Sequence, residues 1–216
     1  MFRQAYACNT SRAKLNPWLI ILPAIRVMPE ELSELIAISP IDGRYQSKTK
    51  PLAQFFSEYA LIKYRVLVEV EWLKSLSMAD ELKEIQKISK GSIAELDELA
   101  ANFSIDDAAA VKTIEQTTNH DVKAVEYWLR DALKTKKNLA PITSFIHFAC
   151  TSEDINNLSY ALMLKGARDK IILPKLISII SNLSDLANKY AGIPMLSRTH
   201  GQPASPTTLG KELANV

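Results

Sequence analysis

Residues Thr151–Tyr190 read TSEDINNLSYALMLKGARDKIILPKLISIISNLSDLANKY, and their pattern predicts a helical fold class. Hydroxyl and acidic residues at 151–154 are typical of a helix N-terminus and predict a long helix over 152–172. Pro174 is expected at the start of a second helix, to about Tyr190, because proline is tolerated in a first turn. Each helix has an apolar stripe that partner helices must cover. Since few partners follow, we expect the bundle to need further chain or further subunits.

The sequence before this stretch also predicts helices. Apolar residues recur three or four positions apart over 52–76 and over 92–102, and a shorter charged helix is expected around 79–88, ended by Lys90-Gly91. Ser104 followed by Asp107 predicts a capped helix start. The expected buried stripes are Phe56, Tyr59, Ile62, Val66, Val70, Leu73 and Leu76 in the first helix, and Val122, Val125, Leu129 and Leu133 in a later helix that starts at Asn119–Asp121.

The remaining stretches complete an all-α prediction. The run 145–150 is apolar and is expected to be buried, and Pro203 and Pro206 are expected to bracket a turn before a final helix from Ser205-Pro206. Glycine is scarce, with six residues, and alternating β-branched residues are rare, which favours helices. We therefore expect a helical N-terminal domain over 29–148, followed over 149–216 by the incomplete start of a long-helix bundle.

Charge and hydropathy indicate which partners and which location to expect. The formal net charge is +2, so composition gives no case for a nucleic-acid partner. No segment is long and apolar enough to span a bilayer, so no membrane partner is expected. Residues 1–28 form a basic extension without an acidic residue, which is either a targeting peptide or translated upstream sequence with Met28 as the start. The expected location is the cytoplasm, or an organelle if the extension targets one.

Three histidines are candidates for acid–base chemistry. His200 lies in Ser197-Arg-Thr-His-Gly-Gln-Pro203, a polar turn, where its imidazole is either a general acid or base or only a turn cap. His120 lies beside Asp121 at a helix start, where it either contacts a bound anion or is incidental to the cap. His147, between two apolar residues, is interpreted as a core histidine with a satisfied hydrogen bond.

Two further segments have side chains suited to anions. Thr151-Ser152 opens a helix and is either a cradle for a carboxylate or phosphate or an ordinary N-cap. Asp42-Gly-Arg-Tyr45 is either a phosphate clamp built on its guanidinium or a common Asp-Gly turn. No metal-ligand spacing, P-loop or dinucleotide glycine fingerprint occurs in the sequence, so neither a metal nor a cofactor is expected.

Four segments carry longer patterns in a fixed order. They are SPIDGRY at 39–45, KTIEQTTNHDVKAVE at 112–126, FIHFACTSEDINN at 145–157 and SRTHGQP at 197–203. Together they resemble the adenylosuccinate lyases of the fumarase/aspartase superfamily, in particular the longer bacterial-type branch. The resemblance covers about Glu31 to Val216. Argininosuccinate lyases and fumarases carry different polar sequences at the TSEDINN segment.

This resemblance implies a helical bundle of the fumarase/aspartase type and a reaction. The family eliminates fumarate from adenylosuccinate, giving AMP, and from the succinylated aminoimidazole carboxamide ribotide in purine biosynthesis, without a metal or organic cofactor. It is a homotetramer whose active sites are shared between subunits and bind a small nucleotide. The implied roles are His200 as general acid, His120 as second histidine, Arg44 and Tyr45 at the phosphate, Asn119 and Asp121 beside the substrate, and Thr151 and Ser152 at the succinyl carboxylates.

One part of the family's chemistry is missing from the sequence. The family's general base is a serine in a Ser-Ser-x-Met-Pro-x-Lys-x-Asn-Pro loop, a pattern that does not occur in the 216 residues. We therefore expect a fragment or a truncated gene product that is inactive alone, whereas the full-length protein is active. The alternatives are an inert truncated paralogue or helical scaffold, and a sister lyase such as argininosuccinate lyase.

Overall fold

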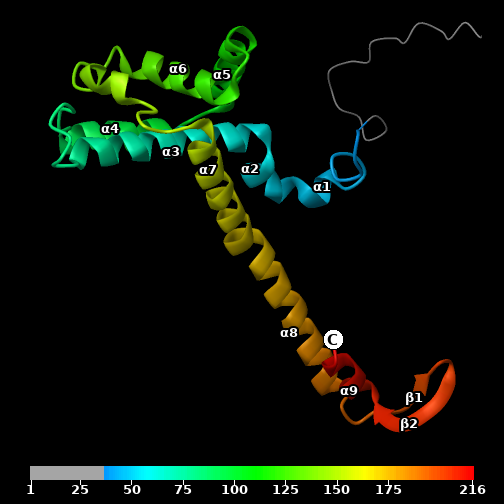
Figure 1. The fold of residues 1–216 in the computed structure, drawn as a ribbon. Coiled ribbons are helices and arrows are strands. Elements are labelled where there is room, and N and C mark those ends of the chain that lie inside the picture. The colour runs from blue at the N-terminus through cyan, green and yellow to red at the C-terminus, as the bar shows by residue number, and fades with distance from the viewer. Residues whose placement is uncertain (1–36) are drawn as a thin grey trace, which may run out of the picture. The chain divides into compact units, whose positions relative to one another are not determined.

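The structure is a computed structural model that describes residues 37–216 (Figure 1). The chain divides into two compact units, Met1–Tyr45 and Gln46–Val216. The first unit is described at residues 37–45 only, so the expected basic extension lies outside the described residues. The second unit contains the helices and the hairpin that are described below.

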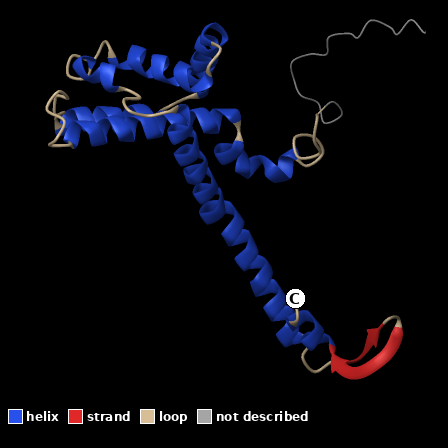
Figure 2. Ribbon diagram, in the orientation of Figure 1, coloured by secondary structure: helices blue, strands red, loops and turns tan. Residues whose placement is uncertain are grey.

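Helices make up most of the second unit, with one small sheet (Figure 2). The α-helices are α1 (Gln46–Thr49), α2 (Ala53–Phe56), α3 (Glu58–Met78), α4 (Lys90–Ala101), α5 (Ile105–Thr118), α6 (Asp121–Leu133), α7 (Ser152–Ala167), α8 (Leu173–Lys189) and α9 (Leu209–Ala214). Two short 3-10 helices, η1 (Lys50–Leu52) and η2 (Ala140–Phe145), a π-helical turn, η3 (Arg168–Ile172), and two strands, β1 (Pro194–Thr199) and β2 (Gln202–Thr208), complete the order.

The main core lies where α3 packs against α4, α5 and α6. The predicted helix over 52–76 is present, but it is divided at Ser57, whose side chain accepts a hydrogen bond from the Ala60 N–H and caps α3. Phe56 was wrongly predicted to be buried: it is 46% exposed, and Phe55 is buried instead. Tyr59 is only partly buried. The other expected core residues are all buried, as predicted: Ile62, Val66, Val70, Leu73, Leu76, Val122, Val125, Leu129 and Leu133.

The connections between these helices confirm some predictions and correct others. Ser104 and Asp107 form a reciprocal capping box at the start of α5, as predicted. The helix expected around 79–88 is wrong, since α3 ends at Met78 and the chain then makes turns. Lys90-Gly91 does not end a helix but begins α4, because Ser89 caps that helix by accepting from the Ser92 N–H.

The Thr151–Tyr190 stretch forms one continuous helical run, not two separate helices. Pro174 lies in the first turn of α8, as predicted, but α7 leads into α8 through η3 without a loop (Figure 1). Proline lacks an N–H and its ring clashes with the carbonyl four residues earlier in an α-helix. In η3 the Leu173 N–H instead donates to the Arg168 carbonyl, five residues back. This π-helical turn lets the helix continue past the proline.

The region after α8 is a β-hairpin, which the sequence did not predict. β1 and β2 pair antiparallel, with Thr199 opposite Gln202 and Pro194 opposite Thr208. His200 and Gly201 lie between the strands with φ of 50° and 76°. Positive φ at both central residues is what a type I′ turn requires, and its twist matches that of paired strands. The prolines therefore lie within β2 rather than bracketing a turn, and the final helix starts at Leu209 rather than at Ser205-Pro206.

Most of α8 is exposed in this single chain. Its exposed apolar side chains are Leu173, Leu176, Ile177, Ile179, Ile180 and Leu186. They recur at helical spacing and form the stripe that the sequence predicted would need partner helices. Within residues 37–216, no helix is long and apolar enough to cross a membrane.

A close backbone contact attaches α9 to the end of α8. Gly210 is buried, and its N–H donates to the Tyr190 carbonyl at 3.0 Å. A Cβ at this position would lie 2.3 Å from the Ala187 carbonyl oxygen and 2.5 Å from the Ala191 nitrogen. Both are backbone atoms, one in the last turn of α8 and one just after it, so they cannot rotate away as a side chain can.

Gly210→Ala is therefore expected to separate α9 from α8. Overpacking of this kind costs about 1–3 kcal/mol, and here the cost falls on one short helix. Amide exchange of residues 209–214 should accelerate while exchange of the α3–α6 core stays unchanged. Gly192→Ala is the matched control, because no atom lies within 4 Å of a Cβ there. Equal exchange in the two variants would contradict the prediction.

Candidate functional site

The turn between α5 and α6 presents Asn119, His120 and Asp121. Asn119 has φ of 50°, a left-handed conformation that asparagine adopts more readily than most residues, and it ends α5. His120 is extended and is the N-cap of α6, where its Nδ1 accepts a hydrogen bond from the Lys123 N–H at 3.1 Å. The sharp reversal thus places three polar side chains at one helix start.

The cap determines which nitrogen of His120 carries its proton. Because Nδ1 is an acceptor, the neutral imidazole has its proton on Nε2. Nε2 lies 3.4 Å from the Ser152 hydroxyl oxygen, at the start of α7. Asp121 Oδ1 is 3.7 Å from Nδ1, a longer contact that would require a proton there and the loss of the cap. In this arrangement His120 offers an N–H donor toward Ser152, not a base.

The start of α7 is a second set of donors. The Asp154 carboxylate accepts from the Thr151 N–H at 2.7 Å and from the Thr151 hydroxyl at 3.0 Å. These two hydrogen bonds hold the pKa of Asp154 below its usual range. The first N–H groups of α7, including that of Ser152, have no acceptor within the helix. The Ser152 hydroxyl, these N–H groups and His120 Nε2 together suit a carboxylate.

A buried arginine connects the two helix starts. Arg65 of α3 is 3% exposed. Its Nη2 donates to Asp121 Oδ2 at 2.6 Å and its Nε donates to Asn156 Oδ1 at 2.9 Å. Burial raises the pKa of Asp121, but the Val122 N–H and Arg65 outweigh it, so the pKa lies below its usual range. Asp121 is thus an ionised anchor for Arg65 at neutral pH.

A buried glutamate holds the segment before α7. Glu69 Oε1 lies 2.6 Å from His147 Nδ1, and Oε2 accepts from the His147 N–H at 3.1 Å. Burial raises the pKa of Glu69 above its usual range, although His147 opposes this shift. The interpretation of His147 as a histidine with a satisfied hydrogen bond agrees with this pair. The run 145–150 is not uniformly buried as expected, because Phe148 and Ala149 are exposed.

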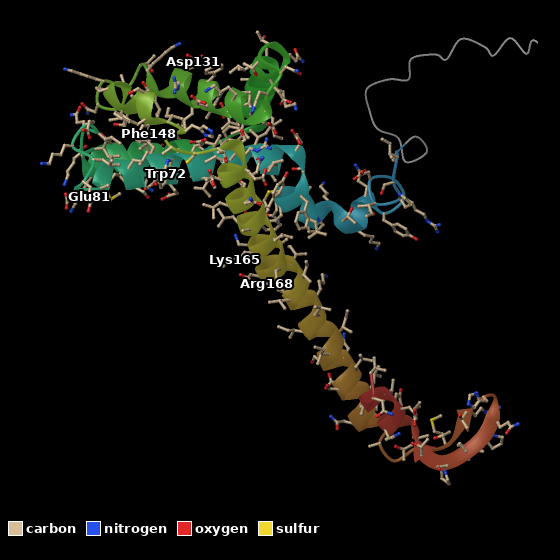
Figure 3. All side chains as sticks on the ribbon, viewed as in Figure 1. Trp72, Glu81, Asp131, Phe148, Lys165 and Arg168 are labelled. Atoms are coloured by element: carbon tan, nitrogen blue, oxygen red, sulfur yellow. The ribbon has the colours of Figure 1, made fainter. Side chains whose placement is uncertain are left out.

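A third residue of α3, Trp72, contacts the segment before α7. The Trp72 indole N–H donates to the Phe148 carbonyl at 2.8 Å (Figure 3). Beside it is an open cavity of about 400 Å³, lined by residues of α3 and α7 and by Cys150. Burial and the nearby Glu69 and Asp154 carboxylates raise the pKa of Cys150, so its thiol stays protonated at neutral pH.

His200 lies far from the other histidines in this chain. It is exposed at the turn of the β1–β2 hairpin, beyond the C-terminal end of α8 (Figure 1). The helical run from Ser152 to Lys189 separates it from Ser152, and at 1.5 Å per residue that run is about 55 Å long. One copy of the chain therefore does not bring His200 to His120.

Arg44 and Tyr45 belong to the first unit and are described within it. The Ile41 N–H donates to the Ser39 hydroxyl, and the Asp42 and Gly43 N–H groups donate to the Ser39 carbonyl, forming a turn. The Arg44 guanidinium lies 5.6 Å from the centre of the Tyr45 ring, and both side chains are exposed. Within residues 37–216, no group of three or more His, Cys, Asp or Glu side chains is placed to hold a metal ion.

Sequence patterns did not identify Arg65, Glu69 and Trp72 as part of this arrangement. They recur at positions i, i+4 and i+7 of α3 and therefore share one helix face. This face borders the predicted apolar stripe, and Glu69 lies at the edge of the stripe itself. Arg65 and Glu69 are opposite charges one helical turn apart among valines and a leucine. This pattern is the signal that indicates buried polar groups on the helix.

Comparisons with known proteins agree with the motifs. The chain is 56% identical to the adenylosuccinate lyase of Escherichia coli strain K12 over 186 residues, which are 86% of this chain and 41% of that protein. Its identity to the adenylosuccinate lyase of Haemophilus influenzae is 55% over 186 residues, with the same coverage. The chain thus spans about two fifths of the length of these relatives.

Solved structures confirm the helical fold. The 3-carboxy-cis,cis-muconate lactonizing enzyme of Pseudomonas putida matches with a TM-score of 0.59 and 22% identity, over 77% of this chain and 35% of that one. This likeness confirms the helical fold that the sequence predicted. A sequence model described as Lyase matches residues 43–216. Since that match covers most of the chain, and the four motifs lie within or beside it, the chain belongs to the lyase family.

Proposed function

We propose that the protein is an adenylosuccinate lyase of purine biosynthesis. It would eliminate fumarate from adenylosuccinate, giving AMP, and from the succinylated aminoimidazole carboxamide ribotide. The observation that carries the proposal is the approach of His120 Nε2 to Ser152 Oγ, at two helix starts whose sequences resemble those of the adenylosuccinate lyases. The chain spans 41% of the Escherichia coli relative, so the proposal concerns the complete protein.

The proposed mechanism uses these groups on a succinyl substrate. Elimination removes a proton from the carbon beside one carboxylate and breaks the C–N bond, which leaves the double bond of fumarate. The Ser152 hydroxyl and the α7 N–H groups would bind a carboxylate and stabilise the negative charge that develops beside it. Thr151, whose N–H and hydroxyl both donate to Asp154, would hold this helix start in place. His120 would donate from Nε2 to the same substrate, with Asn119 and Asp121 shaping the turn. His200 would give the leaving nitrogen its proton, and Arg44 and Tyr45 would bind the phosphate.

We also propose that the active site is shared between subunits of a homotetramer. His200 is separated from Ser152 by the helical run of about 55 Å, so a complete site needs His200 from another copy. The exposed apolar stripe of α8 is a suitable surface for that assembly, because burying it removes apolar side chains from water. The Ser-Ser-x-Met-Pro pattern of the family's base is not in the 216 residues, so the base would also come from outside them.

Fumarate release tests the proposal. The protein encoded by the intact gene should release fumarate from adenylosuccinate and not from argininosuccinate, and the purified 216-residue chain should release none. Release from argininosuccinate alone would make the protein the sister lyase. Release from neither, by a folded protein, would favour a helical scaffold. Turnover by the 216-residue chain alone would contradict the need for a base outside it.

A further inference from the structure

Two buried, oppositely charged residues of α3 each hold one half of the candidate site. Arg65 and Glu69 lie one helical turn apart and are 3% and 0% exposed. Arg65 donates to Asp121 and to Asn156, whereas Glu69 binds His147 in the segment before α7. Burying a charge without partners is unfavourable, so these contacts fix the two segments on α3.

We propose that Arg65 and Glu69 are positioning residues for the lyase reaction. They would set the distance between the turn at 119–121 and the α7 start at 151–152, so that both segments can bind the same substrate carboxylate. This inference rests on the proposed function, from which it takes its substrate. Neither residue is a candidate to touch the reacting atoms.

Arg65 acts on both helices at once. Its Nη2 binds Asp121, the first residue of α6, and its Nε binds Asn156, in the second turn of α7. A guanidinium has donors in a fixed planar fork, so the spacing of its two partners is set by its own geometry. Lysine keeps the charge but has one nitrogen, which cannot reproduce this fork.

Glu69 acts on the segment that leads into α7. It binds both the ring and the backbone N–H of His147, which has φ of 63°. Ala149 has φ of 59°, so two residues shortly before Thr151 are in the left-handed conformation. A non-glycine residue keeps a left-handed conformation only where its surroundings fix it. The two hydrogen bonds to Glu69 provide that restraint.

Lys74 supplies a matched control on the same helix. Its side chain is 11% exposed, compared with 4% for Arg65, and it bridges Glu71 and Asp97 at 2.7 and 2.6 Å. Both residues are thus buried cations of α3 with two polar partners. The partners of Lys74, however, lie in α3 and α4 and not in the 119–121 or 151–152 segments. Loss of Lys74 tests the effect of destabilisation alone.

The experiment compares variants of the protein encoded by the intact gene, at a temperature where each is folded. Arg65→Met and Glu69→Leu should lower kcat/KM for adenylosuccinate about 10- to 100-fold, with a raised KM. Lys74→Met should leave KM unchanged. Glu69→Gln should restore most of the loss, because its amide can still bind the His147 ring and N–H. Arg65→Lys should not restore it, because the fork is lost.

The outcomes that overturn the inference are specific. A wild-type KM in folded Arg65→Met would do so, as would an equal rise of KM in Lys74→Met. Backbone amide shifts of residues 119–122 and 150–153 provide a readout without substrate. They should change in Arg65→Met and not in Lys74→Met, and unchanged shifts would also refute positioning. If wild-type protein releases no fumarate, the proposed function fails, and these shifts still decide the positioning.

Discussion

His200→Ala is expected to lower kcat for adenylosuccinate about 10²–10⁴-fold, the range that a positioned general acid contributes. The imidazole is exposed in this chain and has no core contact, so the fold should not change. Steady-state fumarate release with the complete protein gives kcat, and circular dichroism checks the helices. A kcat within a fewfold of wild type would remove His200 from the proposed role.

A second variant is needed to separate the loss of the His200 imidazole from a change in the turn. The φ of His200 is 50°, so alanine could act through the turn as well as through the lost acid. Asparagine adopts this conformation readily but cannot donate a titratable proton. His200→Asn should therefore lose as much turnover as His200→Ala. Recovery of kcat in the asparagine variant would show that the turn, not the acid, matters.

Mixing inactive subunits tests whether His200 acts across an interface. Ser152→Ala and His200→Ala proteins are each expected to be impaired, for different reasons. If a site takes these residues from different copies, mixed oligomers contain some sites without either substitution and regain activity. No recovery after subunit exchange, verified by mass spectrometry, would contradict a shared site.

His147→Ala is expected to destabilise the fold by about 3–5 kcal/mol at pH 8, the cost of leaving a buried charge without its partner. Glu69 is fully buried, and His147 provides both its ring nitrogen and its N–H. Alanine removes the ring, and the carboxylate then has the backbone contact only. Urea unfolding of wild type and variant at several pH values measures the difference.

The stability that His147→Ala loses should be smaller at low pH. Burial places the pKa of Glu69 above its ordinary value of 4.5, with Glu126 adding to this shift and His147 opposing it. A raised pKa means that protonated Glu69 favours the folded state. Its contribution is present below about pH 4.5 and is lost as pH rises through the folded-state pKa. Removal of His147 raises that pKa further, so the difference between the proteins should grow from pH 5 to pH 8.

Two controls separate charge from backbone effects. His147→Asn keeps a residue that tolerates φ of 63° and can donate its amide to Glu69, so it should lose much less stability. With Glu69→Gln in the background, the loss caused by His147→Ala should no longer depend on pH. A pH-dependent loss in that double variant would assign the effect to another group.

Local patterns were sufficient for most helices of this chain. The spacing of Val122, Val125, Leu129 and Leu133 predicts α6 because one buried face of a helix recurs every three or four residues. Ser104 and Asp107 predict a helix start because the capping box satisfies N–H groups within four residues of chain. The motif around His120 was also recognised, because it lies within one short turn.

The hairpin and the path through Pro174 were not predictable in the same way. Prolines in β2 indicated a turn, but the paired strands and the His200-Gly201 conformation are stabilised together. Pro174 indicated a helix start, and the π-helical turn before it removes the break that a proline normally causes. The predicted turn at the β2 prolines and the predicted separation of two helices at Pro174 were wrong because the conformation of each proline segment depends on the adjoining residues: the paired strand β1 for β2, and the π-helical turn η3 for Pro174.

Local sequence is enough to predict the helical class, the capped helix starts and the polar motifs, since these depend on residues within about one turn of each other. The burial of Arg65 and Glu69, their contacts with Asp121 and His147, 56 and 78 positions away, and the approach of His120 to Ser152 are visible only in the folded chain. So is the position of His200 at the far end of the long helical run. These facts depend on which helix faces pack together, and the physical reason is that a buried charge must find its partner across the fold rather than along the chain.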